Sequence, residues 1–127
     1  NTSAQVKKVL KDVNHPNVKT MFDSFHANIE EANMREAINL LGADCVHVHI
    51  SENNRGIPGS SKNIPWDDVF GGLKDIKYDG WLTIEAFGRA MPALAAATRV
   101  WRDFFPNREE VYKFGYKSMK QGWAKAR

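Results

Sequence analysis

The sequence predicts an α/β fold in which parallel strands are flanked by helices. Two observations carry this prediction. Segments with a helical spacing of apolar residues alternate with short β-prone runs along the chain. Helical segments, not tight hairpins, separate the β-prone runs, and connections of this kind join parallel neighbours. Both an open doubly wound sheet and part of a closed barrel fit this alternation.

In the first third of the chain, a helix is expected over Thr2 to Val13, where Val and Leu recur at helical spacing. Residues 14–17 contain Asn, His, Pro and Asn, which predict a turn. A short strand then covers residues 18–22. A second helix is expected over residues 30–41, because two glutamates suit its N-terminus and Gly42 suits its end.

The next predicted strand, residues 43–50, has two unlike faces. Val46, Val48 and Ile50 share one face, and Cys45, His47 and His49 lie on the other. The remaining elements are, in order, a loop rich in Gly, Asn, Ser and Pro over residues 51–65, a helix over 66–76, a strand over 81–87, and helices over 92–105 and 108–126.

Composition indicates a folded protein without a membrane partner. Hydrophobic residues make up 43% of the 127 residues and charged residues 26%. No apolar run approaches the ~18 residues that span a bilayer, and no signal-peptide pattern is visible. Cys45 is the single cysteine and is expected to be a buried thiol, which fits a reducing cytoplasm.

A nucleic-acid partner is not expected. The net charge of +3 is concentrated after Tyr112, where a solvated helix face is favoured over a binding surface for phosphates. The larger aromatic residues occupy core-like positions and are assigned to packing, not to base stacking. These residues are Trp66, Phe70, Trp81, Trp101, Phe104 and Phe105.

Three candidate metal ligands, Asp23, His49 and Glu85, follow or end successive predicted strands. Because α/β folds collect their active sites at the C-terminal ends of parallel strands, we expect these side chains to converge. One imidazole and two carboxylates suit Mn²⁺, Mg²⁺ or Co²⁺. Asp23 also fits a helix cap, whereas an unpaired Glu85 between apolar neighbours would be costly. His47, deeper in its strand, is interpreted as a packed histidine or as one that supports the ligands from behind, not as a ligand.

Three strings, MFDSFHANIEE, HVHISENNRGIPG and YDGWLTIEAFG, resemble in order and spacing the last three strand ends of the D-tagatose 3-epimerase and D-psicose 3-epimerase family. This family lies in the xylose isomerase-like (AP endonuclease 2-like) TIM barrel superfamily, and the resemblance runs from Asn1 to Phe105. It implies about the last three βα units of a (β/α)₈ barrel with an extra C-terminal helix. Residues 1–127 would then be one partial barrel domain whose N-terminal strands are absent.

The resemblance also implies an activity, the C3 epimerisation of free ketoses such as D-tagatose, D-psicose and D-fructose. One divalent ion, Mn²⁺ by preference, would be held by Asp23, His49 and Glu85. An enediolate stabilised by the metal would form, and two glutamates on opposite faces would move the C3 proton. Glu85 would be one of these catalytic glutamates, and the other, which is also a metal ligand, has no counterpart in this chain.

The resemblance assigns sugar contacts to His26, Arg55 and Phe87. The alternative for His26 and Arg55 is an exposed loop position, with Glu52 as the ion-pair partner of Arg55. Other members of the superfamily, hydroxypyruvate isomerases, inosose dehydratases and apurinic endonucleases, use similar metal chemistry, but the SENNRGIPG loop favours a ketose epimerase.

A partial barrel leaves unpaired strand edges. We therefore expect a partner that covers them, either the N-terminal barrel half or another copy of the chain, which would make it an oligomer. A catalytically inactive fragment that self-associates is the competing hypothesis.

Overall fold

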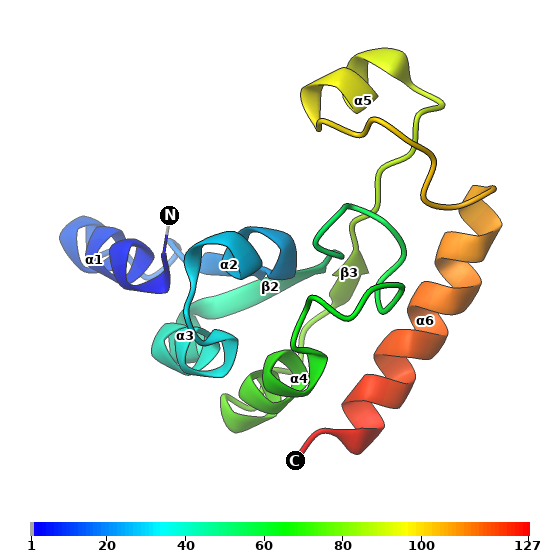
Figure 1. The fold of residues 1–127 in the computed structure, drawn as a ribbon. Helices are drawn as coiled ribbons and strands as arrows, with labels where there is room; N and C mark the ends of the chain where they lie inside the picture. The colour runs from blue at the N-terminus through cyan, green and yellow to red at the C-terminus, as the bar shows by residue number, and fades with distance from the viewer. Residues whose placement is uncertain (1) are drawn as a thin grey trace.

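The computed structural model describes residues 2–127 and contains a three-stranded parallel sheet. The strands β1 (Thr20–Asp23), β2 (Cys45–Ile50) and β3 (Leu82–Ile84) lie side by side in that order. Figure 1 shows α1, α3, α4 and α6 in an arc around the sheet. The helical elements are α1 (Ser3–Val13), α2 (Ser24–Glu30), α3 (Met34–Leu41), the 3₁₀ turn η1 (Gly42–Asp44), α4 (Trp66–Asp75), α5 (Pro92–Ala97) and α6 (Arg108–Lys125). The predicted alternation and the parallel strands are confirmed.

One face of the sheet forms the hydrophobic core with α3 and α4. Phe22 pairs with Val48 in the strand register, and both are buried together with Ile38 of α3 and Val69 of α4. Because side chains alternate along a strand, the opposite face is left with the other set of residues. That face carries the histidines of β2 and is only partly covered. The imidazole side chains of β2 therefore lie on the side of the sheet that faces away from the hydrophobic core.

Val46 was predicted to share the apolar face, and this prediction is wrong. The pairing of β1 with β2 shifts between Thr20, opposite Cys45, and Met21, opposite His47. Val46 is thus an extra residue in β2, a β-bulge, and its side chain is exposed. Cys45, predicted on the face of the histidines, is instead buried in the hydrophobic core for the same reason. A bulge depends on the partner strand, so the alternation within β2 alone does not reveal it.

Helix caps move two of the predicted boundaries. Oδ1 of Asp23 accepts the backbone N–H groups of Phe25 at 2.8 Å and His26 at 3.3 Å, so α2 begins directly after β1. Asn33 caps a separate helix, α3, by accepting the Glu36 N–H at 3.0 Å. The prediction of one helix over residues 30–41 is therefore wrong at its start, since Glu30 ends α2.

Two elements in the C-terminal half of the chain, α5 and β3, are shorter than predicted. The predicted helix over residues 92–105 ends at Ala97, because Arg99 has a φ of 60° that a right-handed helix does not allow. The predicted strand over 81–87 is limited to Leu82–Ile84. The Glu85 N–H still donates to the Ile50 carbonyl at 3.0 Å, so sheet pairing reaches Glu85. The final helix is confirmed as α6.

The aromatic residues divide into a packed and an exposed group. Trp66 and Phe70 of α4 stack at 5.8 Å, as expected for core residues. Trp81 is 85% exposed and Trp101 70% exposed, so their assignment to packing is wrong. Both lie outside helices and strands, where local spacing gives no information about which element covers a side chain.

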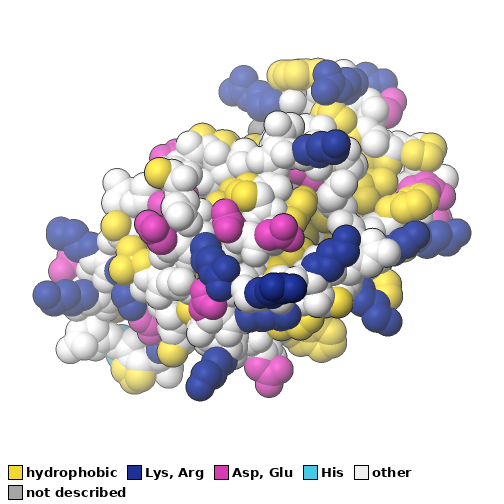
Figure 2. Space-filling model, turned by 60° about the horizontal axis from the view of Figure 1, so that its bottom comes forward, with side chains coloured by type: hydrophobic (Ala, Val, Ile, Leu, Met, Phe, Trp, Pro, Cys, Tyr) yellow, Lys and Arg dark blue, Asp and Glu magenta, His cyan; other side chains and the backbone are white. Residues whose placement is uncertain are grey.

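The surface in Figure 2 carries Lys and Arg side chains interspersed with Asp and Glu. The excess positive charge is therefore not gathered into one patch on that face. Among residues 2–127, no helix combines the length and the apolar character required to cross a bilayer. Cys45 is buried as predicted, and this burial raises the pKa of its thiol.

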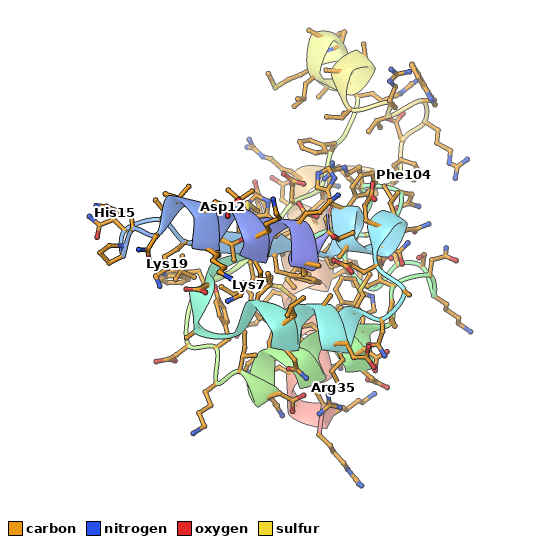
Figure 3. All side chains as sticks on the ribbon, turned by 90° about the vertical axis from the view of Figure 1, so that its left-hand side faces the viewer. Lys7, Asp12, His15, Lys19, Arg35 and Phe104 are labelled. Atoms are coloured by element: carbon orange, nitrogen blue, oxygen red, sulfur yellow. The ribbon has the colours of Figure 1, made fainter. Side chains whose placement is uncertain are left out.

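Two surface carboxylates link neighbouring elements of the fold. Asp44 accepts Lys19 Nζ at 2.8 Å and Lys7 Nζ at 2.6 Å. Figure 3 shows Lys7 pointing from α1 toward the neighbouring elements. Arg35 of α3 binds Asp75 at the end of α4 through Nε, 2.7 Å from Oδ2, and Nη2, 2.8 Å from Oδ1. These hydrogen bonds lower the pKa of both Asp44 and Asp75 to about 2.

Acid is therefore expected to destabilise the chain between about pH 4 and pH 2. A carboxyl whose pKa is lower in the folded state contributes stability above its unfolded pKa and loses it as pH falls through the folded value. Thermal unfolding followed by circular dichroism from pH 6 to pH 2 tests this. Asp75→Asn removes one of the two contributions, so its decline should be shallower. An equally steep decline in this variant would show that Asp75 is not responsible.

Candidate metal centre

Asp23, His49 and Glu85 converge at the C-terminal edge of the sheet. Asp23 and His49 are paired residues of β1 and β2. Thr83 of β3 is opposite His49, so Glu85, two residues further and directly after β3, lies on the same face, and its N–H donates to the Ile50 carbonyl. One ligand atom from each of the three residues lies within 4.8 Å of the other two. The parallel register therefore produces the convergence that was predicted from the strand ends.

Asp23 combines the two functions that the sequence left as alternatives. Its Oδ1 caps α2, as described above, whereas Oδ2 lies 3.4 Å from His49 Nδ1. Because the cap uses one oxygen, the carboxylate is held in place and its second oxygen is aimed at the other two ligands. A helix cap and a metal ligand are thus compatible at this residue.

The surroundings of His49 fit a divalent cation. Its Nδ1 is buried, has no hydrogen-bond partner among the described residues, and lies 3.4 Å from both Asp23 Oδ2 and Glu85 Oε1. Two ligands on opposite sides of an ion are separated by about 4 to 5 Å, twice a metal–ligand bond length of about 2.0 to 2.5 Å. The ligand atoms fall within this limit. A shared cation would satisfy the orphaned nitrogen and both carboxylates.

Glu85 directs its two oxygens to different partners. Oε1 faces His49, and Oε2 forms an ion pair with Arg55 Nη1. The guanidinium of Arg55 lies 3.6 Å from the centroid of the Phe25 ring and 5.1 Å from that of Phe87. The aromatic faces and the carboxylate together fix the position of this cation. One oxygen of Glu85 is therefore available to a metal while the other is held by Arg55.

The predicted substrate-contact residues all lie around Arg55. His26 Nε2 is 3.5 Å from Arg55 Nη2, and the Phe87 N–H donates to the Arg55 carbonyl at 2.9 Å. The alternative pairing of Arg55 with Glu52 is wrong, because Glu52 is fully buried and accepts hydrogen bonds from its own loop. The structure brings His26, Arg55 and Phe87 together beside the three candidate ligands, and the sugar contacts assigned to them stay a prediction.

A buried hydrogen-bonded pair that the sequence did not predict links the strand ends. Ser24 Oγ donates to the Ser51 carbonyl at 2.7 Å and accepts the Ser51 N–H at 2.8 Å. Ser24 follows Asp23, and Ser51 lies two residues beyond His49, so the pair fixes the relative positions of two ligands. A serine directly after a strand has many roles, and no pattern in the sequence singled this one out.

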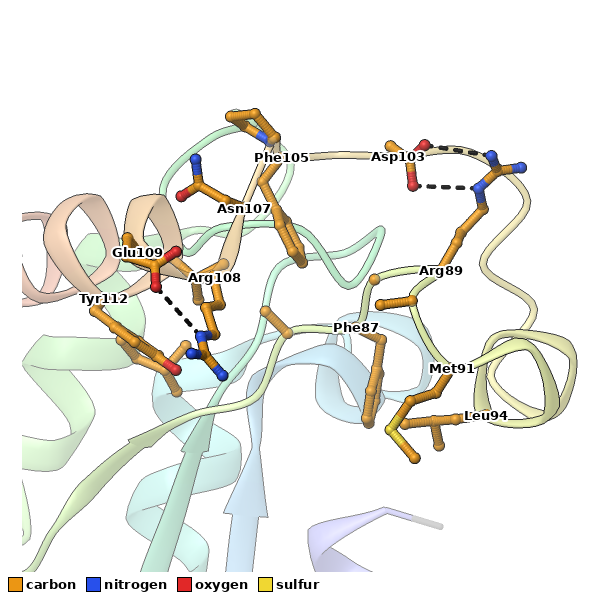
Figure 4. Close-up of a pocket in the computed structure, with 16 residues that line it drawn as sticks. Phe87, Arg89, Met91, Leu94, Asp103, Phe105, Asn107, Arg108, Glu109 and Tyr112 are labelled. Carbon is orange, nitrogen blue, oxygen red and sulfur yellow. Dashed lines mark hydrogen bonds and ion pairs between the residues drawn. The ribbon is translucent and has the colours of Figure 1, made fainter.

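Cavities lie on both sides of Glu85 and differ in their chemistry. A cavity of about 420 Å³ is lined by all three candidate ligands and by His26. A larger hollow of about 900 Å³ lies between the segment after β3 and the start of α6, and it includes Phe87 (Figure 4). Its charged side chains are paired with each other, Arg89 with Asp103 and Arg108 with Glu109. The smaller cavity is therefore the candidate site.

Comparison with known proteins relates this geometry to a family. The sequence model of the xylose isomerase-like TIM barrel family matches residues 1–121 of the 127 residues. The chain belongs to this family. The three-stranded sheet, with the candidate ligands at its C-terminal strand ends, is therefore a part of the xylose isomerase-like barrel architecture.

Among members of this family, the chain is similar to ketose 3-epimerases. It is 36% identical over 110 residues to the D-psicose 3-epimerase of Enterocloster bolteae, which covers 87% of this chain. A solved L-ribulose 3-epimerase superimposes with a TM-score of 0.91 at 29% identity over 98% of the chain. The Clostridium cellulolyticum D-psicose 3-epimerase solved with D-tagatose superimposes at 0.85, with 33% identity over 96%. The chain spans 36% of the curated relative and 42% and 43% of the two solved chains.

Proposed function

We propose that this chain carries metal-binding and proton-transfer residues of a ketose 3-epimerase, with Mn²⁺ as the preferred ion and Mg²⁺ or Co²⁺ as substitutes. The observation that carries the proposal is the gathering of Asp23, His49 and Glu85 within 4.8 Å, in a chain similar to proteins named ketose 3-epimerases. Oxygen-rich ligand sets with one imidazole suit these ions. When bound, the ion supplies positive charge that makes the C3 proton of a ketose more acidic.

The proposed proton acceptor is Glu85. It takes the C3 proton and leaves an enediolate on the sugar, and return of a proton to the opposite face inverts C3. Oε2 of Glu85 is paired with Arg55, so Arg55 has to shift its hydrogen bond toward a sugar hydroxyl when Glu85 acts as a base. His26 would donate to a second hydroxyl, and the Phe87 ring would cover the apolar side of the sugar.

Inversion requires a second acid on the other face of the sugar. We assign it to a glutamate of the barrel outside residues 1–127, because the chain spans only 36% of the length of its curated relative. Such a glutamate would reach the site from the N-terminal barrel half or from an associated chain. The proposed partners are therefore a free ketose and the remainder of the barrel.

Proton exchange tests the proposal without requiring inversion. The 127-residue chain is incubated with D-fructose, D-tagatose or D-psicose and Mn²⁺ in ²H₂O, and deuterium at C3 is measured by NMR. We expect exchange at C3 that stops when EDTA removes the metal and that is retained in Glu36→Gln, a matched change on an exposed glutamate of α3. Exchange without inversion would place the second acid outside the chain. Absence of exchange with all three ketoses would refute the proposal.

A further inference from the structure

The loop between β2 and α4 contains a fully buried carboxylate. Glu52 is 0% exposed, and among the described residues no Lys, Arg or His forms an ion pair with it. Its Oε2 accepts the Gly59 N–H at 2.8 Å, and its Oε1 accepts the Ser61 hydroxyl at 2.8 Å. The N–H groups of Asn53, 3.3 Å from Oε1, and Ser61, 3.5 Å from Oε2, complete the donors.

These donors explain why a charged side chain is buried here. A buried carboxylate is costly unless hydrogen bonds compensate for the lost water, and bonds to an ionised group are stronger than neutral ones. Because the donors lie seven and nine residues along the chain, Glu52 closes the loop upon itself. The α6 helix presses on the closed loop from outside, since a Cβ on Gly59 would lie 3.1 Å from the Ser118 Cβ.

Arg55 lies inside the segment that Glu52 closes. Its N–H donates to the Glu52 carbonyl at 3.0 Å, and its φ of 66° lies in the left-handed region that Arg rarely adopts. The next residue, Gly56, is packed tightly, since a Cβ there would lie 3.3 Å from the Phe104 Cβ. An unfavourable backbone conformation persists only where the surrounding structure enforces it. The closed loop thus directs the guanidinium of Arg55 toward Glu85.

We propose that Glu52 is a positioning residue, which holds the loop in the one conformation that presents Arg55 to Glu85. Glu52 itself lies away from the reacting atoms and acts through Arg55. This inference deepens the proposed function and rests on it for the role of Arg55. From the sequence, Glu52 was considered only as an ion-pair partner of Arg55, since an acidic residue in a loop rich in Gly and Ser is ordinarily exposed.

A double-mutant cycle tests the proposal in the C3 exchange assay. Glu52→Gln keeps the shape of the side chain but replaces one carboxylate oxygen by an amide N–H₂ group. This group cannot accept a hydrogen bond from the Gly59 N–H or the Ser61 hydroxyl, so one of the hydrogen bonds that close the loop is lost. We expect the exchange rate to fall by about 10- to 100-fold, with Mn²⁺ affinity changed by less than about 3-fold. In the Arg55→Ala background, Glu52→Gln should cause no further loss. Equal losses in both backgrounds would overturn the proposal, because they would indicate a general structural role.

A second variant guards against poor folding of Glu52→Gln. Ser61→Ala removes one donor to the same carboxylate and leaves the charge in place. We expect a smaller loss that again depends on Arg55. Retention of the wild-type rate in Ser61→Ala together with an additive loss in Glu52→Gln would contradict the proposal.

A readout that does not need turnover separates this inference from the proposed function. Amide hydrogen exchange of Gly59 and Ser61, and the Arg55 Nε–H signal, are measured by NMR in the wild-type chain, Glu52→Gln and Glu36→Gln. We expect faster exchange at Gly59 and Ser61 and a shifted Arg55 signal in Glu52→Gln alone. If the ketoses show no C3 exchange but these signals change, the proposed function fails and the positioning role stands. Unchanged signals refute the positioning role.

Discussion

His49→Ala is expected to lower the affinity of the chain for Mn²⁺ by at least about 100-fold, more than the usual effect of changing a residue behind the ligands. His49 contributes the single nitrogen of the candidate site, and its Nδ1 lies 3.4 Å from an oxygen of each carboxylate. Without the imidazole, two carboxylates remain, and Arg55 already neutralises one of them. Titration calorimetry with Mn²⁺ at constant pH measures the loss.

His47→Ala is the matched control for this experiment. His47 lies on the same face of β2, and its ring contacts the His49 ring edge-on at a centroid distance of 4.9 Å. It is not among the three converging ligands. We expect its replacement to change the Mn²⁺ affinity by less than about 10-fold, the lower end of what residues behind a ligand contribute. Similar affinities for wild type and His49→Ala would show that the three residues are not a metal site.

Phe70→Ala is expected to reduce the free energy of unfolding by about 3 to 5 kcal/mol. Phe70 of α4 is 2% exposed and faces α6, where its ring meets Trp123 edge-on at 6.4 Å. The helix α6 approaches so closely that a Cβ on Gly122 would clash with the Phe70 ring. The substitution leaves a cavity at this contact, and α6 is the helix that packs on the loop of Arg55.

Urea unfolding followed by tryptophan fluorescence measures this effect. Trp81→Ala provides the control, because the removal of a side chain that is 85% exposed should change the unfolding free energy by less than about 0.5 kcal/mol. A loss below about 1 kcal/mol in Phe70→Ala would show that the contact between α4 and α6 contributes little, since a large aromatic side chain in a packed core is worth several times this amount.

The positions of residues that depend mainly on their own strand and its neighbours in sequence were predicted well. The alternation in β2 placed His49 opposite the apolar Val48 and Ile50, and the strand ends placed Asp23 and Glu85 near His49. These positions follow from the two-residue repeat of a strand and from the parallel arrangement that the intervening helices impose. The three quoted strings added the family, which the match over residues 1–121 confirms.

The errors concern residues whose surroundings are formed by distant parts of the chain. The bulge at Val46 depends on β1, and the exposure of Trp81 and Trp101 depends on which elements pass over them. The helix start at Ser24 was missed although Asp23 was considered as a cap, because the glutamates at residues 30 and 31 gave a competing signal for a helix N-terminus.

The sequence by itself determined the order of the elements, the parallel sheet and the identity of the three candidate ligands, because these depend on residue type and spacing along the chain. Only the tertiary structure decided which partner each polar atom of a functional side chain contacts. It directs one oxygen of Asp23 to a helix cap and the other to His49, and it pairs Arg55 with Glu85 while Glu52 closes the loop. The contacts of Asp23 with His49 and of Arg55 with Glu85 join residues 26 and 30 positions apart, and the Glu52 contacts depend on the conformation of a closed loop. The free energy of such contacts is set by burial and geometry that no local pattern encodes.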